Sequence, residues 1–327
     1  MSEYKKYEEE LELESLEGIG PSTKQKLVSA GIHSIVDLLV YAPTYIAEII
    51  GGSVDRVIKL QEAARKRLQK LGLLEEEFMT ADKLHERRKL VSHITTGSKH
   101  LDNLLLGGIE TQAITEFYGE FGTGKTQLCH TLAVNVQLPI DKGGLESPAI
   151  YIDTEMTFKS ERVIQIADAK GLDPLETLRN IYVAKARGAS HLILLVRDLP
   201  KKIRETGARL VLIDSAVAPF RAEYIGRGQL SERQQLLNVM MHDLIRMAEL
   251  YNVAIVITNQ VLAAPDVIYG DPTRPIGGHV VAHAVTYRIY LRKAKGNTRI
   301  ASIVDSPRHP PGEAIFMIGP DGIKDPS

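Results

Sequence analysis

The chain has 327 residues, a formal net charge of -1, one cysteine and the composition of a globular protein. This length predicts one large or two unequal domains, and the near-neutral charge neither supports nor excludes a nucleic-acid partner. Cys129 cannot form an internal disulfide, the N-terminus lacks the pattern of a secretory signal, and no apolar run reaches membrane-spanning length. We therefore expect a cytoplasmic protein without a membrane partner, or a nuclear one where the source has a nucleus.

The first 70 residues fall into two segments that differ in composition. Residues 1–14 are rich in glutamate and predict an acidic disordered tail, whereas residues 15–70 carry short helical patterns separated by glycine turns. The turn that contains Gly18 and Gly20 is similar to the helix-hairpin-helix module, in which backbone N–H groups contact DNA phosphates without reading sequence. These two glycines are expected DNA contacts; a compact helix connection that binds nothing is the alternative.

Residues 71–93 are strongly charged and predict a linker between domains. Phe78 stands in this segment between charged residues, with Ala81 three positions later. An aromatic side chain with no local core to enter is unusual in a linker. We interpret the pair as an anchor for another subunit.

From residue 94 to residue 327, apolar runs alternate with helical patterns, which predicts an α/β domain with a mostly parallel sheet. Most of these runs are almost continuously apolar, as expected of strands covered on both faces. The predicted strands are Ala113 to Tyr118, Ala149 to Asp153, Ile181 to Ala184, Leu210 to Asp214, Ala254 to Thr258 and Thr286 to Arg292. Residues 298–304 and 313–318 predict a closing antiparallel hairpin.

A phosphate-binding loop is predicted at Gly119–Thr126, which supplies every residue of the pattern G-x-x-x-x-G-K-[ST] between a predicted strand and a predicted helix. Its glycines allow successive N–H groups to point at a phosphate near a helix N-terminus. Lys125 would reach the β- and γ-phosphates, and the Thr126 hydroxyl would hold Mg²⁺. The alternative is a glycine-rich turn that binds no ligand.

Polar residues end three of the predicted strands. Asp214 ends an apolar strand, which is typical of the carboxylate that holds Mg²⁺ through water at the ligand-binding edge of an α/β sheet. Glu155 follows a second strand and could orient or deprotonate an attacking water, although Asp153 or Glu155 could equally be a helix N-cap. Gln260 follows a third strand, where it could sense a γ-phosphate.

Two long segments follow the strands that end near Asp214 and Gln260, and loops of this length are usually functional or disordered. The first combines guanidinium groups with aromatic rings, a mixture suited to phosphate contact and base stacking; a solvated surface is the alternative. Its residues are Phe220, Arg221, Tyr224, Arg227 and Arg233. The second runs from about Val261 to Ala284 and is rich in glycine and proline.

Taken together, these residues resemble the archaeal RadA recombinases, relatives of bacterial RecA and of the eukaryotic strand-exchange recombinases. The resemblance covers nearly the whole chain from Leu16 to Asp325. Its most specific motifs are Thr96-Gly97-Ser98, Leu101-Asp102, Gly107-Gly108-Ile109-Glu110-Thr111, the Gly119–Gln127 loop, Phe220-Arg221-Ala222-Glu223-Tyr224, Gly226-Arg227-Gly228, Glu232-Arg233-Gln234-Gln235, Thr258-Asn259-Gln260-Val261, Gly270-Asp271-Pro272-Thr273 and Gly277-Gly278-His279.

The resemblance implies a RecA-like P-loop ATPase core that uses ATP and Mg²⁺ to form a filament on single-stranded DNA. The filament pairs this strand with homologous double-stranded DNA and exchanges strands, as a DNA-dependent ATPase in recombination and repair. Self-association into a helical filament or ring and loading by recombination mediators are implied as well.

The resemblance also implies roles for individual residues. Glu155 resembles the catalytic carboxylate, with Lys125 and Gln260 as its partners in catalysis, and Arg162 resembles the residue that stacks on adenine. The nucleotide would contact Gly119, Glu120, Phe121, Gly122, Thr123, Gly124, Lys125, Thr126 and Gln127. Arg221, Arg227 and Arg233 match the first DNA-binding loop, and Gly277, Gly278 and His279 match the second. Phe78 and Ala81 match a polymerisation motif, while Asp305 and Pro307 belong to a cap laid over the nucleotide by a neighbouring subunit.

Three departures from the family pattern leave two rival functions open. Met156 follows Glu155 where a small or polar residue is expected, Ala264 replaces a frequent basic residue, and Arg308 begins a less apolar stretch of the cap. The first two favour a regulatory paralogue without strand exchange, against which the complete N-terminal domain and the Phe78 motif argue. The other rival is a hexameric helicase built on the same core.

Overall fold

The computed structural model describes residues 7, 9–224, 226–263, 273–276 and 278–326. The chain forms two compact units: Met1–Val91 together with Arg197–Gly207, and Ser92–Val196 together with Ala208–Ser327. Within the described residues, no helix is long and apolar enough to cross a membrane.

The first unit is built on short helices, as the sequence predicts. Their bounds are α1 (Pro21–Ser29), α2 (Asp37–Val40), α3 (Pro43–Ile50), α4 (Val54–Lys70) and α5 (Ala81–Arg87), with single 3₁₀ turns η2 (Leu13–Ser15) and η3 (Arg88–Leu90). Pro21 and Pro43 stand in the first turns of α1 and α3, where a missing N–H costs nothing. The Ser53 hydroxyl caps α4 by accepting a hydrogen bond from the Arg56 N–H. Apolar side chains from these helices, including Leu27, Ile46 and Leu60, are buried together.

The structure corrects one boundary in this unit. Leu11 and Leu13 are buried and Glu12 pairs with Ser34, so the predicted disordered tail 1–14 extends too far. These leucines have a core to enter, because the turn that precedes α1 brings the chain back to them. The predicted linker 71–93 contains the helix α5.

The second unit contains a large mixed sheet. Its strands are β3 (Ala113–Gly119), β4 (Ala149–Asp153), β5 (Ile181–Lys185), β6 (Leu210–Asp214), β7 (Ala254–Asn259), β10 (Tyr287–Lys293), β11 (Thr298–Asp305), β12 (Glu313–Gly319) and β13 (Gly322–Lys324). The strands lie in the order β13-β12-β11-β10-β3-β7-β6-β4-β5. Pairing is parallel from β10 to β5 and antiparallel from β10 to β13, so the mostly parallel sheet and the closing hairpin are confirmed.

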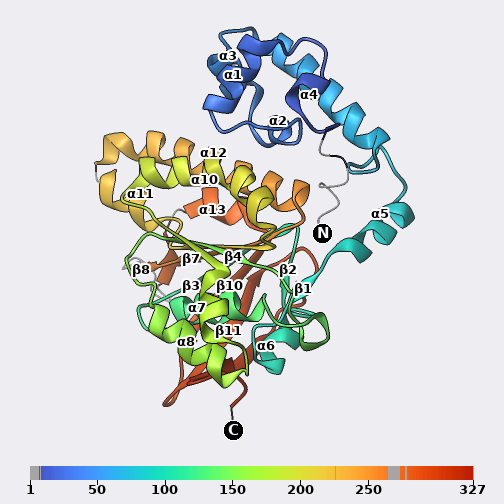
Figure 1. Cartoon of the computed structure of the whole chain (residues 1–327). Coiled ribbons are helices and arrows are strands. Elements are labelled where there is room, and N and C mark those ends of the chain that lie inside the picture. The colour runs from blue at the N-terminus through green and yellow to red at the C-terminus, as the bar shows by residue number, and fades with distance from the viewer. Residues whose placement is uncertain (1–6, 8, 225, 264–272, 277, 327) are drawn as a thin grey trace. The chain divides into compact units, whose positions relative to one another are not determined.

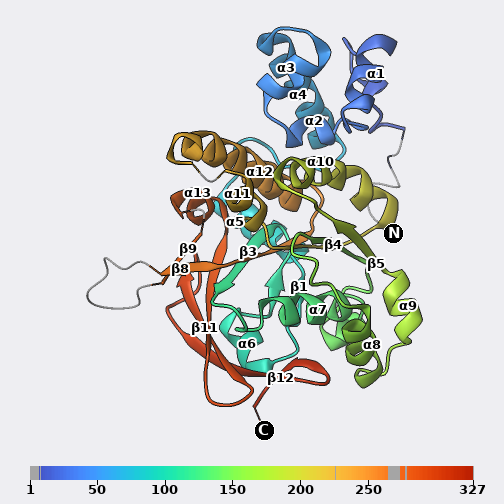
Figure 2. The same cartoon turned by 90° about the vertical axis from the view of Figure 1, so that its left-hand side faces the viewer.

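Helices cover both faces of this sheet. The helices of this unit are α6 (Lys99–Leu104), α7 (Lys125–Asn135), α8 (Ser160–Ala169), α9 (Pro174–Arg179), the first half of α10 (Ala189–Thr206, of which Arg197–Thr206 belong to the first unit), α11 (Ala218–Glu223), α12 (Leu230–Leu250) and α13 (Gly278–Ala284), with 3₁₀ turns η4 (Ile140–Lys142) and η5 (Arg227–Gln229). Two antiparallel pairs form separate two-stranded sheets: β1 (His93–Ile94) with β2 (Ile109–Glu110), which are separated in sequence by α6, and β8 (Val261–Ala263) with β9 (Thr273–Pro275), the β8–β9 hairpin. Figures 1 and 2 show α7 and α8 on one face and α12 and α13 on the other. Leu128 and Leu132 of α7 share a buried cluster with Phe117 and Leu212 of the sheet.

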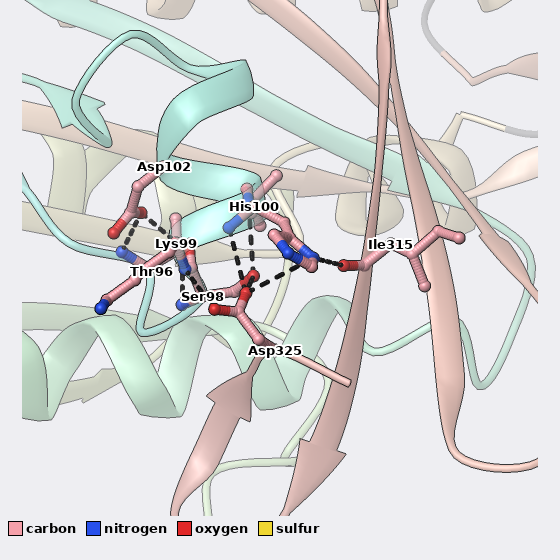
Figure 3. Close-up of polar contacts among 8 residues, drawn as sticks. Thr96, Ser98, Lys99, His100, Asp102, Ile315 and Asp325 are labelled. Carbon is pink, nitrogen blue, oxygen red and sulfur yellow. Dashed lines mark hydrogen bonds and ion pairs between the residues drawn. The ribbon is translucent and has the colours of Figure 1, made fainter. Parts of the chain in front are cut away.

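The last residues of the second unit are tied to its beginning (Figure 3). The Asp325 carboxylate accepts hydrogen bonds from the Ser98 hydroxyl at 2.6 Å and from the N–H groups of Lys99 and His100 at the start of α6. His100 Nδ1 lies 3.2 Å from the Ile315 carbonyl oxygen of β12. The first N–H groups of a helix have no partner within the helix. At α6, Asp325 supplies that partner from 226 residues further along the chain.

Candidate functional site

The Gly119–Thr126 loop turns from the end of β3 into α7, as the sequence predicts. Gly124 precedes the helix with a left-handed φ of 102°, and a Cβ on Gly119 would lie 2.2 Å from the Leu291 carbonyl oxygen. A side chain would strain the backbone at Gly124 and would clash at Gly119, so each position requires glycine. The Thr123 hydroxyl donates to the Glu120 carbonyl oxygen at 2.9 Å and closes the loop. The Phe121 side chain, at the tip, is 94% exposed.

Lys125 begins α7 and points back over the loop. Its ammonium donates to the carbonyl oxygens of Gly119 at 2.8 Å and Glu120 at 2.9 Å. Burial lowers the pKa of Lys125, and the nearby carboxylates of Asp214 and Glu155 oppose that shift. A half-buried cation over a loop of N–H groups is an arrangement that favours a polyanion.

Asp214 lies at the carboxyl end of β6 and is almost fully buried. It accepts hydrogen bonds from the Tyr151 hydroxyl at 2.9 Å and from the Thr258 hydroxyl, which come from the neighbouring strands β4 and β7. Burying a polar group is costly unless it is hydrogen-bonded in this way. Both bonds fix the orientation of its oxygens at the sheet edge.

Glu155 and Gln260 meet although 105 residues separate them. Gln260 Nε2 donates to Glu155 Oε1 at 2.8 Å. Burial raises the pKa of Glu155, the charge of Asp214 raises it further, and the hydrogen bond from Gln260 opposes both. The structure thus brings the expected water-activating carboxylate and the expected γ-phosphate sensor into direct contact.

The alternative in which Asp153 or Glu155 caps a helix is wrong. The next helix, α8, begins at Ser160 with Lys159 at its N-cap position. Asp153 instead accepts hydrogen bonds from the N–H groups of Glu155, Thr157 and Phe158, and so shapes the turn that presents Glu155. Met156 takes a left-handed φ of 58° in this turn, and its side chain is half exposed.

These groups surround one cavity of about 390 Å³. Its lining residues are Phe121, Gly122, Gly124, Lys125, Thr126, Gln127, Glu155, Thr157, Asp214, Ser215, Thr258, Gln260, Arg299 and Ile318. The hydroxyls of Thr157 and Ser215 are buried there and have no hydrogen-bond partner among the described residues. Loop N–H groups, one ammonium, buried hydroxyls and two carboxylates fit a nucleotide phosphate chain with Mg²⁺.

Several residues that line this cavity were not predicted from the sequence. Ser215 and Thr258 had a usable signal, because each lies at the carboxyl end of a predicted strand. Arg299 and Ile318 come from the β11–β12 hairpin and carry no local signal.

Arg162 of α8 does not line this cavity. Its guanidinium donates to Gln127 Oε1 at 2.7 Å and to the carbonyl oxygens of Gly319 at 2.6 Å and Pro320 at 2.9 Å. Burial lowers the pKa of Arg162. The side chain joins α7 and α8 to the turn after β12, beside the loop predicted to hold the nucleotide.

The first long segment is mostly helical. Arg221 lies in α11 and is exposed, Arg233 lies in α12 and is half-buried, and Arg227 begins η5, with its side chain outside the described part. Phe220 is fully buried, so the prediction that it is free to stack on bases is wrong. Pro219 in the first turn of α11 is the signal for a helix that the sequence reading overlooked.

The second long segment is described only in part. Gly277 and Ala264 lie outside the described residues, whereas Gly278 and His279 begin the backbone of α13. The expected loop is therefore a short β8–β9 hairpin stem followed by a helix.

Gly18 and Gly20 form the turn before α1, as expected of a hairpin. Gly18 has a φ of 94°, and its carbonyl oxygen accepts from Arg56 at 3.0 Å. In the charged segment that follows, Phe78 is 92% exposed and Ala81 is the first residue of α5. The Phe78 ring therefore has no core of its own to fill within this unit.

Asp305 ends β11 and, like Pro307, does not line the cavity of its own chain. Arg308, one of the departures from the family pattern, forms an ion pair within its own unit. Its guanidinium lies 3.2 Å from the buried Glu110 carboxylate. His309 stacks edge-on against Tyr287, with ring centroids 5.0 Å apart. The polar residues of this segment thus hold it against the body of the unit.

The phosphate loop, the carboxylates at the sheet edge and the parallel sheet define a P-loop nucleotide-binding α/β protein. The Rad51 family model matches residues 86–326, and the SAM-like helix-hairpin-helix tandem model matches residues 10–70. A DNA repair and recombination protein RadA from Cenarchaeum symbiosum (strain A) is 49% identical over 317 residues, which cover 97% of this chain and 80% of that relative. The chain belongs to the Rad51 family of RecA-like recombinases.

Proposed function

We propose that this chain is an ATP-dependent recombinase that assembles on single-stranded DNA, pairs it with homologous double-stranded DNA and exchanges strands in recombination and repair. Family membership supports the class of activity. The observation that carries the chemistry is the convergence of Lys125, Glu155, Asp214 and Gln260 on one cavity at the carboxyl edge of the sheet.

In this proposal, each polar group at the cavity has one task in hydrolysing ATP to ADP and phosphate. The loop N–H groups and the Lys125 ammonium bind the β- and γ-phosphates, so that charge is stabilised during transfer. Thr126 and Asp214 would hold Mg²⁺, which neutralises phosphate charge when bound. Glu155 orients the attacking water and accepts its proton, while the Gln260 amide holds the Glu155 carboxylate in place.

Assembly would complete the site. The exposed Phe78, with Ala81, would dock on a neighbouring copy, and Asp305 and Pro307 would cover the neighbour's nucleotide rather than their own. That Asp305 and Pro307 lie away from the lining of their own cavity supports this arrangement. ATP would then lie between protomers of a filament or ring.

DNA would contact Arg221, Arg227 and Arg233 in the first segment and Gly277, Gly278 and His279 in the second, with Gly18 and Gly20 adding backbone contacts. Since guanidinium groups replace counterions on phosphates, binding should weaken steeply with salt. Mediator proteins would load the filament in the cytoplasm.

Strand exchange between a single-stranded circle and a homologous linear duplex tests the proposal. The wild-type protein should convert the substrates to joint molecules only with ATP and Mg²⁺, and Lys125→Ala should give none. Nucleotide and DNA binding without joint molecules would instead indicate a regulatory paralogue. Processive unwinding of a forked duplex would indicate a helicase.

A further inference from the structure

The loop between β11 and β12 is fastened to the body of its unit at two neighbouring positions. Arg308 of this loop lies 3.2 Å from the Glu110 carboxylate of β2. The next residue, His309, stacks edge-on against the Tyr287 ring of β10, and the Tyr287 hydroxyl donates to Glu110 Oε2 at 2.8 Å. The four side chains therefore form one closed cluster, which we call the loop clamp.

The clamp is built on buried groups. Glu110, Tyr287 and His309 are all buried, and Arg308 covers Glu110 while 32% of its own side chain stays exposed. A buried carboxylate is costly without hydrogen-bond partners, and Tyr287 and Arg308 both approach the same oxygen, Oε2. Removing Arg308 would leave Glu110 without its cation, and the loop would lose its attachment at this position.

Another buried ion pair of this unit shows what is different about the clamp. Arg288 Nε donates to Glu116 Oε2 at 2.7 Å, but these two residues lie opposite each other on the paired strands β10 and β3. Backbone hydrogen bonds already join those strands. Arg308 instead joins a strand to a loop, and loops are ordinarily more mobile than the strands that they connect. The clamp thus restrains a segment that the sheet itself does not hold.

Hydrogen bonds within the loop direct the clamp residues inward. Ser306 Oγ accepts from the N–H groups of Arg308 at 3.2 Å and His309 at 2.9 Å, and it lies 2.7 Å from His309 Nδ1. The residues on either side of Ser306, Asp305 and Pro307, are exposed. One conformation of the loop therefore fastens Arg308 and His309 and presents Asp305 and Pro307 to the outside.

The clamp has no task in the cavity of its own chain, because none of its side chains lines that cavity. What it fixes is the segment that carries Asp305 and Pro307. A segment held in one conformation before association loses less entropy on binding, and it therefore binds more tightly. The benefit of the clamp should appear where Asp305 and Pro307 meet a partner.

We propose that Arg308 and His309, held by Glu110 and Tyr287, are positioning residues that order the β11–β12 loop before assembly and so strengthen nucleotide binding in the neighbouring copy. The inference rests on the proposed function, which assigns Asp305 and Pro307 to the neighbour's nucleotide. The clamp acts on the site of the next protomer and leaves the affinity of an isolated chain unchanged.

Hydrogen exchange in unassembled protein tests whether the clamp orders the loop. The unassembled state is obtained with Phe78→Ala, or by dilution until light scattering shows monomers. In peptides that cover residues 303–312, Arg308→Met should speed exchange by about tenfold, as expected when one hydrogen bond to a charged group is lost. Arg308→Lys keeps a charge beside Glu110 and should restore part of the protection. Arg179→Met removes an exposed arginine of α9 and should change nothing in these peptides.

Nucleotide affinity in assembled and unassembled protein shows which site the clamp serves. The probe is a fluorescent, non-hydrolysable ATP analogue, with Mg²⁺ and oligothymidine present. In assembled protein, Arg308→Met should raise the Kd for the analogue by at least about fivefold, the lower end of typical coupling between sites. In unassembled protein the same substitution should leave the Kd unchanged, whereas a general loss of structure would raise it in both states.

Tyr287→Phe supplies a second variant, because it removes only the hydroxyl that contacts Glu110 and keeps the ring against His309. It should raise the Kd in assembled protein alone, as Arg308→Met does. Unchanged exchange in residues 303–312, an unchanged Kd in the assembled variants, or an equal rise in both states would overturn the inference. Equal affinity of the assembled and unassembled wild type would show instead that the proposed site between protomers is wrong, even if the clamp orders the loop.

Discussion

Among single residues, Glu155 carries the sharpest expectation because its environment favours the protonated form. Burial and the Asp214 charge raise its pKa, yet the proposed task requires the ionised form. ATP turnover should therefore fall as the pH drops through a value above the ordinary glutamate pKa of about 4.3. Glu155→Gln should lower kcat by about 10²- to 10⁴-fold at neutral pH, the usual effect of removing a general base.

Fluorescent-nucleotide titration and a pH–rate profile check this expectation. Glu155→Gln should bind ATP nearly as well as the wild type, because Lys125 and the loop are untouched. If the variant hydrolyses ATP at the wild-type rate, another group activates the water.

Residue chemistry at this site was partly predictable. The phosphate loop, Asp214, Glu155 and Gln260 could be located in the sequence because each stands at the end of an apolar strand. The sequence does not reveal that Asp153 shapes the turn before Glu155, nor which side chains contact Glu116. Both depend on groups that meet only after the strands pair. Glu116 and Arg288 are 172 residues apart in sequence.

At the scale of elements, the parallel strands were predicted within about one residue, because most of them are almost continuous apolar runs and three of them, β3, β4 and β6, end at a glycine or an acid. The helices α11 and α13 were taken for loops. Pro219 in the first turn of α11 is a helix signal that was overlooked, whereas α13 packs against α12, a contact that the local sequence does not reveal.

The start of α6 gives an element-level prediction. Asp325 caps it, and although burial opposes the shift, hydrogen bonds from Ser98, His100 and Lys99 lower the pKa of Asp325. A carboxylate whose pKa is lower in the folded state stabilises it above the unfolded value of about 3.9, and that contribution disappears as the pH falls through the folded pKa. Asp325→Asn should cost about 1 kcal/mol of unfolding free energy at pH 7, the typical cost of losing a cap.

Urea unfolding from pH 7 down to pH 3 measures that contribution. The difference between the wild type and Asp325→Asn should be constant near neutral pH and should shrink toward the acid end. Asp168→Asn changes an exposed aspartate of α8 and serves as the control. An equal loss in both variants would show that the cap has no special role.

For the whole molecule, the proposed docking of Phe78 on a neighbouring copy predicts whether the chain assembles. A side chain with 92% of its surface exposed gains most from burial against a partner. Phe78→Ala should shift the protein to monomers in light scattering and should remove filaments from electron micrographs. Ile140→Ala removes another large exposed side chain, at 70% exposure, and should leave assembly unchanged. Normal filaments formed by Phe78→Ala would contradict the assignment of the charged segment.

The measurement that tests the central claim most directly is the rate of ATP hydrolysis by the wild-type protein with and without single-stranded DNA. The proposed recombinase should hydrolyse ATP slowly alone and several-fold faster with oligothymidine, and the stimulation should decline as salt displaces the DNA. Hydrolysis that is indifferent to DNA at every salt concentration would contradict the claim.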